Sequence, residues 1–313
     1  MTKNNNLHRA RRERNDEFYT LYQNIERELK HYSNAFGGKI VYCNCDDARH
    51  SNFTKYFVNN FDSLGLKKLI CTCYNANGNG MVFFYDGHTS HLETLQHNGD
   101  FRSEECISYL KECDVVVTNP PFSLFREYVA QLMEYNKKFL IIGNTNGITY
   151  KEIFPYIKNN ELWLGCSSFN SGMYFKVPND YEYANTYKFD RERNGSKVMR
   201  VSSICWYTNI DHNKRNQPLD LYKSYNEIDF PKYDNYDAIE VSKVADIPMN
   251  YDGVMGVPIT FLDKYCPSQF EIVGITENAD YLKSIYIPNQ PKYDRPYING
   301  KRIYSRLLIK MRK

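Results

Sequence analysis

The sequence predicts an α/β fold, in which a doubly wound and mostly parallel sheet is followed by a smaller C-terminal lobe. Up to about residue 210, short β-branched or apolar runs alternate with stretches of helical period. Apolar runs of this kind are typical of parallel strands that helices cover on both faces. From about Asp211 the chain consists of short aromatic pieces interrupted by proline, which indicates a separate lobe.

Length and composition are those of an ordinary globular protein, because 42% of the 313 residues are apolar and 25% are charged. The net charge of +3 permits a nucleic-acid partner without requiring one, and no pattern fixes an oligomeric state. We find no signal-peptide pattern and no apolar run of bilayer length, so we expect a cytoplasmic protein without membrane contact. The nine cysteines lack Cys-x-x-Cys spacing, which favours reduced thiols and no metal site.

The predicted elements begin after a basic arm over residues 1–15, which contains four arginines. Leu21, Ile25 and Leu29 fall four apart and predict a helix, and a second helix starts at Ser123. Strands are expected over 39–45, 67–74, 115–119, 139–144, 162–165, 172–177 and 201–209. Residues 78–87 read as an excursion without a clear role, and 179–200 as an exposed loop. We therefore expect an α/β domain over 16–210 and a lobe over 211–313.

The most informative residues are Asn119, Pro120, Pro121 and Phe122, which follow a buried strand and precede a helix. In open α/β sheets, ligands lie beyond the carboxyl ends of the strands. Because proline has no N–H group, this loop offers carbonyl acceptors in a fixed extended geometry. The position and the residue types together predict a ligand site here.

The acceptors suit an aromatic amine such as N6 of adenine, whose lone pair is delocalised into the ring. Hydrogen bonds from both amine protons localise that pair, and the Asn119 side-chain oxygen and the Pro120 carbonyl are placed to accept them. Phe122 would stack on the face of the base. On the motif alone, the alternative that these residues only end a strand and cap a helix stays open.

Two further groups of residues predict a cofactor half-site. Asn44, Asp46 and Asp47 end the first predicted strand, and Gly99-Asp100-Phe101 lies between that strand and Asn119. An acid at a strand end can accept hydrogen bonds from a nucleoside, and a following aromatic can pack on its ring. Alternatively, Asp100 only caps the helix expected over 103–113.

These residues resemble those of the EcoRI-type adenine-specific DNA methyltransferases, over residues 16 to about 209. The likeness is most specific in TNPPFSLFREY (118–128) and KFLIIG (138–143). Asn119, Pro120, Pro121 and Phe122 match the catalytic signature Asp/Asn/Ser-Pro-Pro-Tyr/Phe of that family. The resemblance implies a Rossmann-like class I methyltransferase fold, S-adenosyl-L-methionine as cofactor, and a catalytic domain over 16–210.

The resemblance also implies the cofactor contacts. The aromatic motif that lines the methionine end of the cofactor is matched by Phe18, Tyr19 and Thr20, and the acid-aromatic pair around its adenine by Asp100 and Phe101. The usual glycine-rich turn is replaced by Cys43, Asn44, Cys45, Asp46 and Asp47. The ribose-binding acid is missing after Cys73-Tyr74, so Asp46 or Asp47 is expected to take that role.

The implied reaction is site-specific methylation of adenine N6 in double-stranded DNA, with the target base flipped out of the helix. The DNA phosphates are expected to contact the arm and the basic residues of the 179–200 loop; alternatively, these basic residues only form a solvated surface. The DNA sequence is expected to be recognised by the 179–200 loop and by the 211–313 lobe. A cognate restriction endonuclease would be a genetic partner only. RNA adenine methylation, protein glutamine methylation and an inactive DNA-binding relative remain as alternatives, since the first two use the same Asn-Pro-Pro chemistry.

Overall fold

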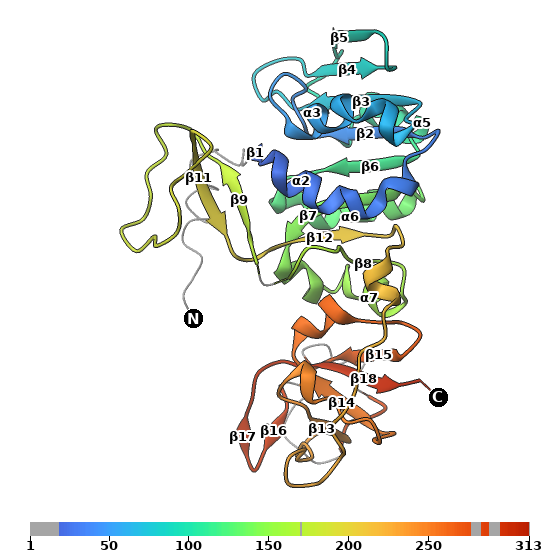
Figure 1. The fold of residues 1–313 in the computed structure, drawn as a ribbon, viewed down its shortest axis with the longest axis vertical. Coiled ribbons are helices and arrows are strands. Elements are labelled where there is room, and N and C mark those ends of the chain that lie inside the picture. The colour runs from blue at the N-terminus through green and yellow to red at the C-terminus, as the bar shows by residue number, and fades with distance from the viewer. Residues whose placement is uncertain (1–18, 170, 277–282, 288–294, 313) are drawn as a thin grey trace. The chain divides into compact units, whose positions relative to one another are not determined.

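A computed structural model describes residues 19–169, 171–276, 283–287 and 295–312 of the chain (Figure 1). The chain divides into two compact units. The first takes in the described residues up to Thr145 together with Ser167–Ile210, and the second takes in Asn146–Cys166 and the described residues from Asp211 on. Residues 146–166 therefore group with the C-terminal part, whereas the sequence predicted one domain over 16–210.

The first unit is built on a large mixed sheet with the strand order β5-β4-β3-β2-β6-β7-β12, which Figure 1 shows as a stack of arrows. Its strands are β2 (Ile40–Asn44), β3 (Lys68–Cys73), β4 (Met81–Tyr85), β5 (Ser90–Thr94), β6 (Val115–Thr118), β7 (Lys138–Asn144) and β12 (Ile204–Thr208). Strands β3, β2, β6 and β7 are parallel, while β4, β5 and β12 run antiparallel to their neighbours. The predicted α/β class is confirmed, and the sheet is mixed.

The α-helices of this unit are α2 (Tyr22–Leu29), α3 (Asn52–Asn59), α4 (Phe61–Leu64), α5 (Glu104–Glu112) and α6 (Phe125–Glu134), and its 3-10 helices are η1 (Lys30–Ala35) and η2 (Phe122–Leu124). The helices α2 and η1 precede β2, and the others follow it in the chain. A further 3-10 helix, η3 (Thr145–Thr149), begins at Thr145 and continues into the residues of the second unit. Ser51 and Ser103 cap α3 and α5 by accepting hydrogen bonds from backbone N–H groups of the first turn. The helix expected from Ser123 is thus a short 3-10 turn followed by α6.

A second, antiparallel sheet of the first unit has the order β1-β9-β11-β10. Its strands are β1 (Tyr19–Thr20), β9 (Met173–Lys176), β10 (Glu192–Arg193) and β11 (Ser196–Val201). Asn194 and Gly195 both have positive φ, 51° and 69°, at the turn between β10 and β11. Part of the expected 179–200 loop is therefore a hairpin, because its Asn-Gly pair forms a tight turn.

The second unit contains a four-stranded sheet with the order β13-β14-β18-β15 and a β16–β17 hairpin. Its elements are α7 (Phe154–Lys158), β8 (Trp163–Leu164), η4 (Asn213–Asn216), β13 (Ala238–Glu240), η5 (Val244–Asp246), β14 (Val254–Val257), η6 (Ile259–Lys264), β15 (Phe270–Ile275), β16 (Tyr297–Ile298), β17 (Lys301–Arg302) and β18 (Leu307–Met311).

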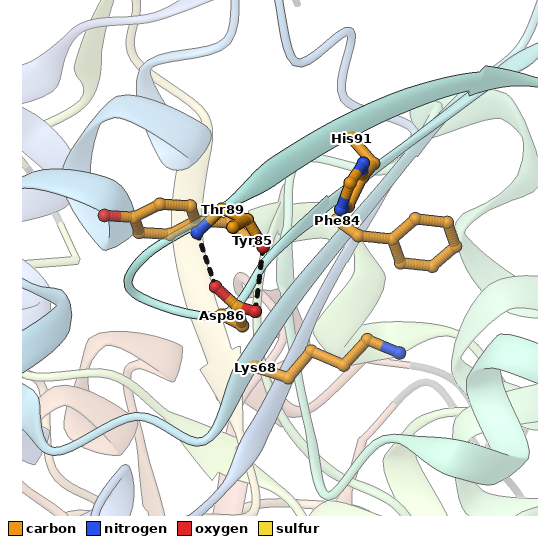
Figure 2. Close-up of a pocket in the computed structure, with 6 residues that line it drawn as sticks. All are labelled: Lys68, Phe84, Tyr85, Asp86, Thr89 and His91. Carbon is orange, nitrogen blue, oxygen red and sulfur yellow. Dashed lines mark hydrogen bonds between the residues drawn. The ribbon is translucent and has the colours of Figure 1, made fainter.

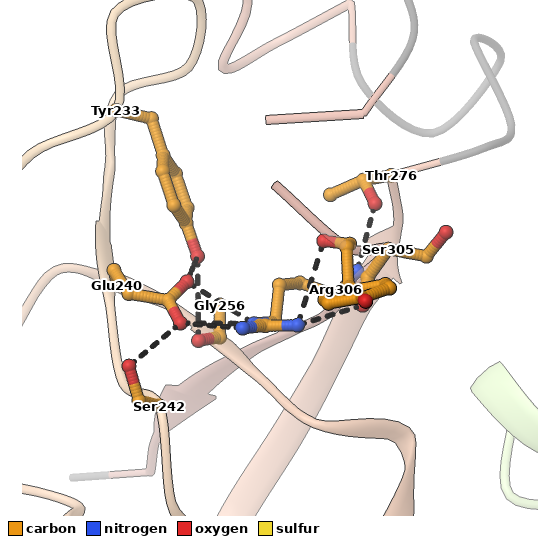
Figure 3. Close-up of polar contacts among 8 residues, drawn as sticks. Tyr233, Glu240, Ser242, Gly256, Thr276, Ser305 and Arg306 are labelled. Carbon is orange, nitrogen blue, oxygen red and sulfur yellow. Dashed lines mark hydrogen bonds and ion pairs between the residues drawn. The ribbon is translucent and has the colours of Figure 1, made fainter. Parts of the chain in front are cut away.

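The second unit contains a buried ion pair (Figure 3). The Arg306 guanidinium contacts the Glu240 carboxylate at 2.6 Å, and the two side chains are only 13% and 7% exposed. Tyr233 and Ser242 also donate hydrogen bonds to this carboxylate, at 2.6 and 3.1 Å. The pair thus joins β13 to the start of β18.

None of the helices in the described part of the chain has the length and apolar character of a membrane span.

Candidate active site

The site forms where the strand order of the large sheet changes direction. The chain passes from β2 to β3 on one side and then returns to β6 on the other, so a crevice is expected between the carboxyl ends of β2 and β6. The first of these ends carries Asp46 and Asp47, and the second carries Asn119. Two of the predicted groups of site residues therefore lie on adjacent strands.

The β6 end places the Asn-Pro-Pro-Phe residues in a turn between strand and helix. Pro120 is buried, and Asn119, Pro121 and Phe122 are half-buried. The side-chain oxygen of Asn119 is itself sequestered from solvent. The Pro121 carbonyl accepts a hydrogen bond from the Leu124 N–H at 3.0 Å, which starts η2 at Phe122. The turn thus has a defined backbone path.

The β2 end replaces a glycine-rich turn with a left-handed residue, since Cys45 has φ 68°. Non-glycine residues with this conformation are uncommon and are enriched at ligand sites. Asn44 and Cys43 just before it are buried, and the Tyr128 hydroxyl of α6 donates to the Asn44 side-chain oxygen. Burial raises the pKa of the Cys43 and Cys45 thiols well above their usual value. Both thiols are therefore protonated near neutral pH.

The Asp46 carboxylate connects three elements. It accepts hydrogen bonds from the Ser51 hydroxyl at 2.8 Å and the Thr118 hydroxyl at 2.5 Å. The backbone N–H of Asn119 also bonds to it, and the Asp46 N–H donates to the Thr72 carbonyl on β3 at 2.9 Å. Burial raises the pKa of Asp46 to about 7, against the lowering effect of the Thr118, Ser51 and Asn119 hydrogen bonds.

Two other predicted acids each bind the arginine two residues later. Asp47 accepts from the Arg49 guanidinium at 2.7 Å, and Asp100 accepts from that of Arg102 at 2.7 Å. These hydrogen bonds lower the pKa of both carboxyl groups, so both are ionised near neutral pH. Ser103, and not Asp100, supplies the side-chain cap of α5, which removes the alternative that Asp100 only caps that helix.

Phe101 is 4% exposed and packs against Tyr128 of α6 with ring centroids 5.1 Å apart. The Gln131 amide, also on α6, donates to the Phe101 carbonyl at 3.2 Å. Tyr128 therefore contacts both Asn44 and Phe101, and joins two predicted groups of cofactor residues.

The N-terminal motif lies beside the start of α3. The Thr20 carbonyl accepts a hydrogen bond from the Asn52 side chain at 2.8 Å, while Tyr19 pairs with Lys176 on β9. The Thr20 hydroxyl oxygen is buried and has no hydrogen-bond partner among the described residues. Phe18 and the 1–15 arm lie outside the described residues.

The 179–200 segment carries a row of aromatic rings. Tyr181, Tyr183, Tyr187 and Phe189 follow one another with centroid distances of 5.5, 4.9 and 5.7 Å. Guanidinium groups lie over this surface, with that of Arg191 5.0 Å from Tyr183 and that of Arg200 4.5 Å from Phe189. Flat rings and cations therefore lie together on this segment.

A separate surface hollow of about 240 Å³ lies on β3, β4 and β5 (Figure 2). It is lined by Lys68, Phe84, Tyr85, Asp86, Thr89 and His91. Asp86 there accepts hydrogen bonds from Thr89 and from the His88 N–H, which lower its pKa to about 2. The hollow contains none of the predicted site residues. Within the described part of the chain, no three His, Cys, Asp or Glu residues cluster in a way that could hold a metal ion.

Sequence reasoning missed several residues of this site: Ser51, Thr118, Tyr128, Arg49 and Arg102. Only Ser51 had a usable signal, since a serine before a helical pattern predicts a cap. The partners of Thr118 and Tyr128 depend on the pairing of β2 with β6 and on the packing of α6, whereas Arg49 and Arg102 bind acids two residues earlier in the chain.

The family model for the adenine-specific methyltransferase EcoRI matches residues 6–91 and 76–312, two overlapping segments. The chain therefore belongs to the EcoRI family of adenine-specific methyltransferases. Among its relatives, the type II methyltransferase M.EcoRI of Escherichia coli is 48% identical, over 95% of this chain and 97% of the relative. Type II methyltransferases of Mycoplasma genitalium, M.MgeORF184P, and Mycoplasma pneumoniae, M.MpnI, are 41% and 40% identical, over 97% and 98% of this chain and 98% of each relative. No solved structure gives a significant match.

Proposed function

We propose that the chain transfers a methyl group from S-adenosyl-L-methionine to N6 of adenine at specific sites in double-stranded DNA. The observation that carries this proposal is the buried Asn119 oxygen at the carboxyl end of β6, beside the polar end of β2. Membership of the EcoRI family supports adenine as the target.

The Asn-Pro-Pro-Phe turn would activate and orient the amine. The Asn119 side-chain oxygen and the Pro120 carbonyl accept its two N–H groups, which localises the nitrogen lone pair. Phe122 stacks on the base and fixes the direction of attack. No base is required at the start, because an amine proton becomes acidic only as the new N–C bond forms, and it then leaves to water.

The residues at the ends of β2 and β1 fit the proposed cofactor. When bound, S-adenosyl-L-methionine supplies a methyl group on a positively charged sulfur, which takes up the electron pair of the breaking C–S bond. The unpartnered, buried Thr20 hydroxyl suits the polar methionine end. Asp47 and Asp100 are ionised acceptors for nucleoside hydroxyl and amino groups, and Phe101 borders that position. The remaining predicted contacts are Phe18, Tyr19 and the Cys43–Asp46 turn.

Duplex DNA must open for this reaction, because a stacked adenine cannot reach the Asn119 turn. The aromatic and cationic segment over 179–200 is our candidate for holding the DNA, since rings and guanidinium groups serve stacking and phosphate contact. The arm over 1–15 and a target-recognition role for a 211–313 lobe remain predictions, as do the doubly wound description, a restriction endonuclease as genetic partner and a cytoplasmic location.

The test is to incubate the full chain with tritiated S-adenosyl-L-methionine and, separately, unmethylated duplex DNA, total RNA and a protein extract. The digested products are then identified. We expect N6-methyladenine from the DNA alone. Label in RNA or in protein glutamine would show that RNA or protein, and not DNA, is the substrate. Binding of the cofactor without methyl transfer would indicate an inactive relative.

A further inference from the structure

We propose that Asp46 is a positioning residue for methyl transfer, whose ionised carboxylate holds the backbone of Asn119 in its reactive geometry. This inference rests on the proposed function, and it gives Asp46 a different task from the cofactor contact predicted from the sequence. The residue would act through Asn119 and would not itself touch the amine.

The placement of Asp46 carries the inference. The register of β2 with β6 covers Val41 with Val115 and Tyr42 with Val116. Beyond these pairs, side chains bridge the two strands: the Thr118 hydroxyl contacts the Asn44 carbonyl and, at 2.5 Å, the Asp46 carboxylate. Asp46 therefore joins the two strands beyond the last residues that pair in the sheet.

Three groups meet this carboxylate: the Ser51 hydroxyl, the Thr118 hydroxyl and the Asn119 N–H. The Thr118 hydroxyl has one proton, which the Asp46 carboxylate shares with the Asn44 carbonyl. An ionised carboxylate only accepts, so it can serve the Ser51 hydroxyl and the Asn119 N–H fully and the Thr118 hydroxyl in part. The amide of asparagine has the same shape, but it offers one accepting oxygen and turns its NH₂ group toward a donor. The site is thus built for a charged oxygen pair.

The bond to the Asn119 N–H matters because both proposed acceptors of the amine follow directly from it. This bond restricts the backbone of Asn119, and so it aims the Asn119 side-chain oxygen and the Pro120 carbonyl. A shift of about 1 Å in reacting groups costs roughly a hundredfold in rate. Loss of the carboxylate should therefore lower kcat rather than cofactor affinity.

Protonation of Asp46 is a natural probe of this role. Its pKa is raised to about 7, mainly by burial, and the neighbouring Asp47 carboxylate adds to the increase. The thiols of Cys43 and Cys45 also face it, and each has a raised pKa to which the Asp46 charge contributes. Below about pH 7, one oxygen carries a proton and the donors lose an acceptor.

The experiment compares Asp46→Asn with Asp114→Asn as the matched control. Asp114 also bridges β2 and β6, by accepting from the Ile40 N–H at 2.8 Å, but it does so at the amino ends of the strands. For each protein, single-turnover methyl transfer to duplex DNA is measured from pH 5.5 to 8.5, together with cofactor affinity by calorimetry. These pH limits are a practical range of about three units around the pKa.

We expect the wild type and Asp114→Asn to lose activity as the pH falls through about 7. Asp46→Asn should be slower by at least about tenfold at pH 8, with a flat profile and with cofactor affinity changed by less than about twofold. A wild-type rate and pH profile in Asp46→Asn would overturn the inference. Weakened cofactor binding at an unchanged rate would also overturn the inference, and would favour the cofactor contact that the sequence predicted for Asp46.

A second variant covers the case in which Asp46→Asn does not fold. Ser51→Ala removes one donor from the carboxylate, which should raise the pKa of Asp46 further. The fall in activity on the acid side of the pH profile should therefore occur at a higher pH than in the wild type. An unmoved acid side of the profile would contradict the inference. Absence of DNA methylation by the wild type would instead overturn the proposed function, and the inference with it.

Discussion

Asn119 concentrates the proposed chemistry in one side chain, so its removal should separate catalysis from binding. We expect Asn119→Ala to lower kcat by about a hundredfold to a thousandfold, the usual cost of losing one hydrogen-bond partner of a reacting group. Cofactor affinity should change little, because the lost oxygen contacts the target amine only. Single-turnover assays and calorimetry check both, and a fully active variant would refute the assignment.

Asp46 also gives the stability of the protein a definite pH dependence. Its pKa is about 7 in the folded state, whereas an unfolded aspartate titrates near about 4. Between these values the folded state binds more protons, so Asp46 makes the free energy of unfolding decrease as the pH rises from about 4 to about 7. Below and above this window its contribution is constant.

Urea denaturation of wild type and Asp46→Asn at several pH values tests this sign. The difference in unfolding free energy between them should shift in favour of the variant as the pH rises toward about 7. A pH-independent difference would show that Asp46 titrates alike in both states.

At the residue scale, the sequence could predict a role for Asn119, Pro120, Pro121 and Phe122 because consecutive residues form the motif, and the structure places them in one turn after β6. It did not reach the task of Asp46, since Ser51 and Thr118 contact it only after β2 has paired with β6. Local patterns identify chemistry held within one turn. They do not identify hydrogen bonds that connect distant segments.

At the scale of elements, apolar runs located β2, β3, β6 and β7 to within a residue or two, since strands buried on both faces need such runs. The 179–200 segment and the 78–87 excursion were harder. The first contains β10 and most of β11, and the second contains the whole of β4, which pairs with the fully exposed β5. The exposed strands β5 and β10 carry mostly polar side chains, so their composition resembles that of loops, whereas β4 is apolar and is flanked by glycine, asparagine and aspartate.

The 179–200 segment leads to a prediction about DNA affinity. Arg191 lies over Tyr183 and is exposed, so it is available to a phosphate. We expect Arg191→Ala to weaken DNA binding and to lower the slope of log affinity against log salt by about one. Lys111→Ala is the matched control, because Lys111 also lies over a ring, that of Tyr135. Lys111 belongs to α5, outside the 179–200 segment. Equal salt slopes in all three proteins would remove this segment from the DNA surface.

At the scale of the whole molecule, the Glu240–Arg306 pair provides a test of the second unit by itself. Arg306→Met leaves Glu240 buried without its cation, which should destabilise this unit by about 3–5 kcal/mol. Chemical denaturation monitored by hydrogen exchange should show the loss of stability in β13, β14 and β18. Lys301→Met on exposed β17 should change stability by less than about 0.5 kcal/mol. Equal losses in both variants would contradict a special role for the buried pair.

The division into units also has a consequence for synthesis. Residues 146–166 leave the ribosome well before 211–313, the segment they group with, and the strands β9 to β12 of the first unit emerge between them. The nascent chain must therefore hold an unfinished piece of the second unit while it completes the first. No single cut divides this polypeptide into two whole units, so a gene truncated after residue 210 would encode the first unit with an orphan segment inside it.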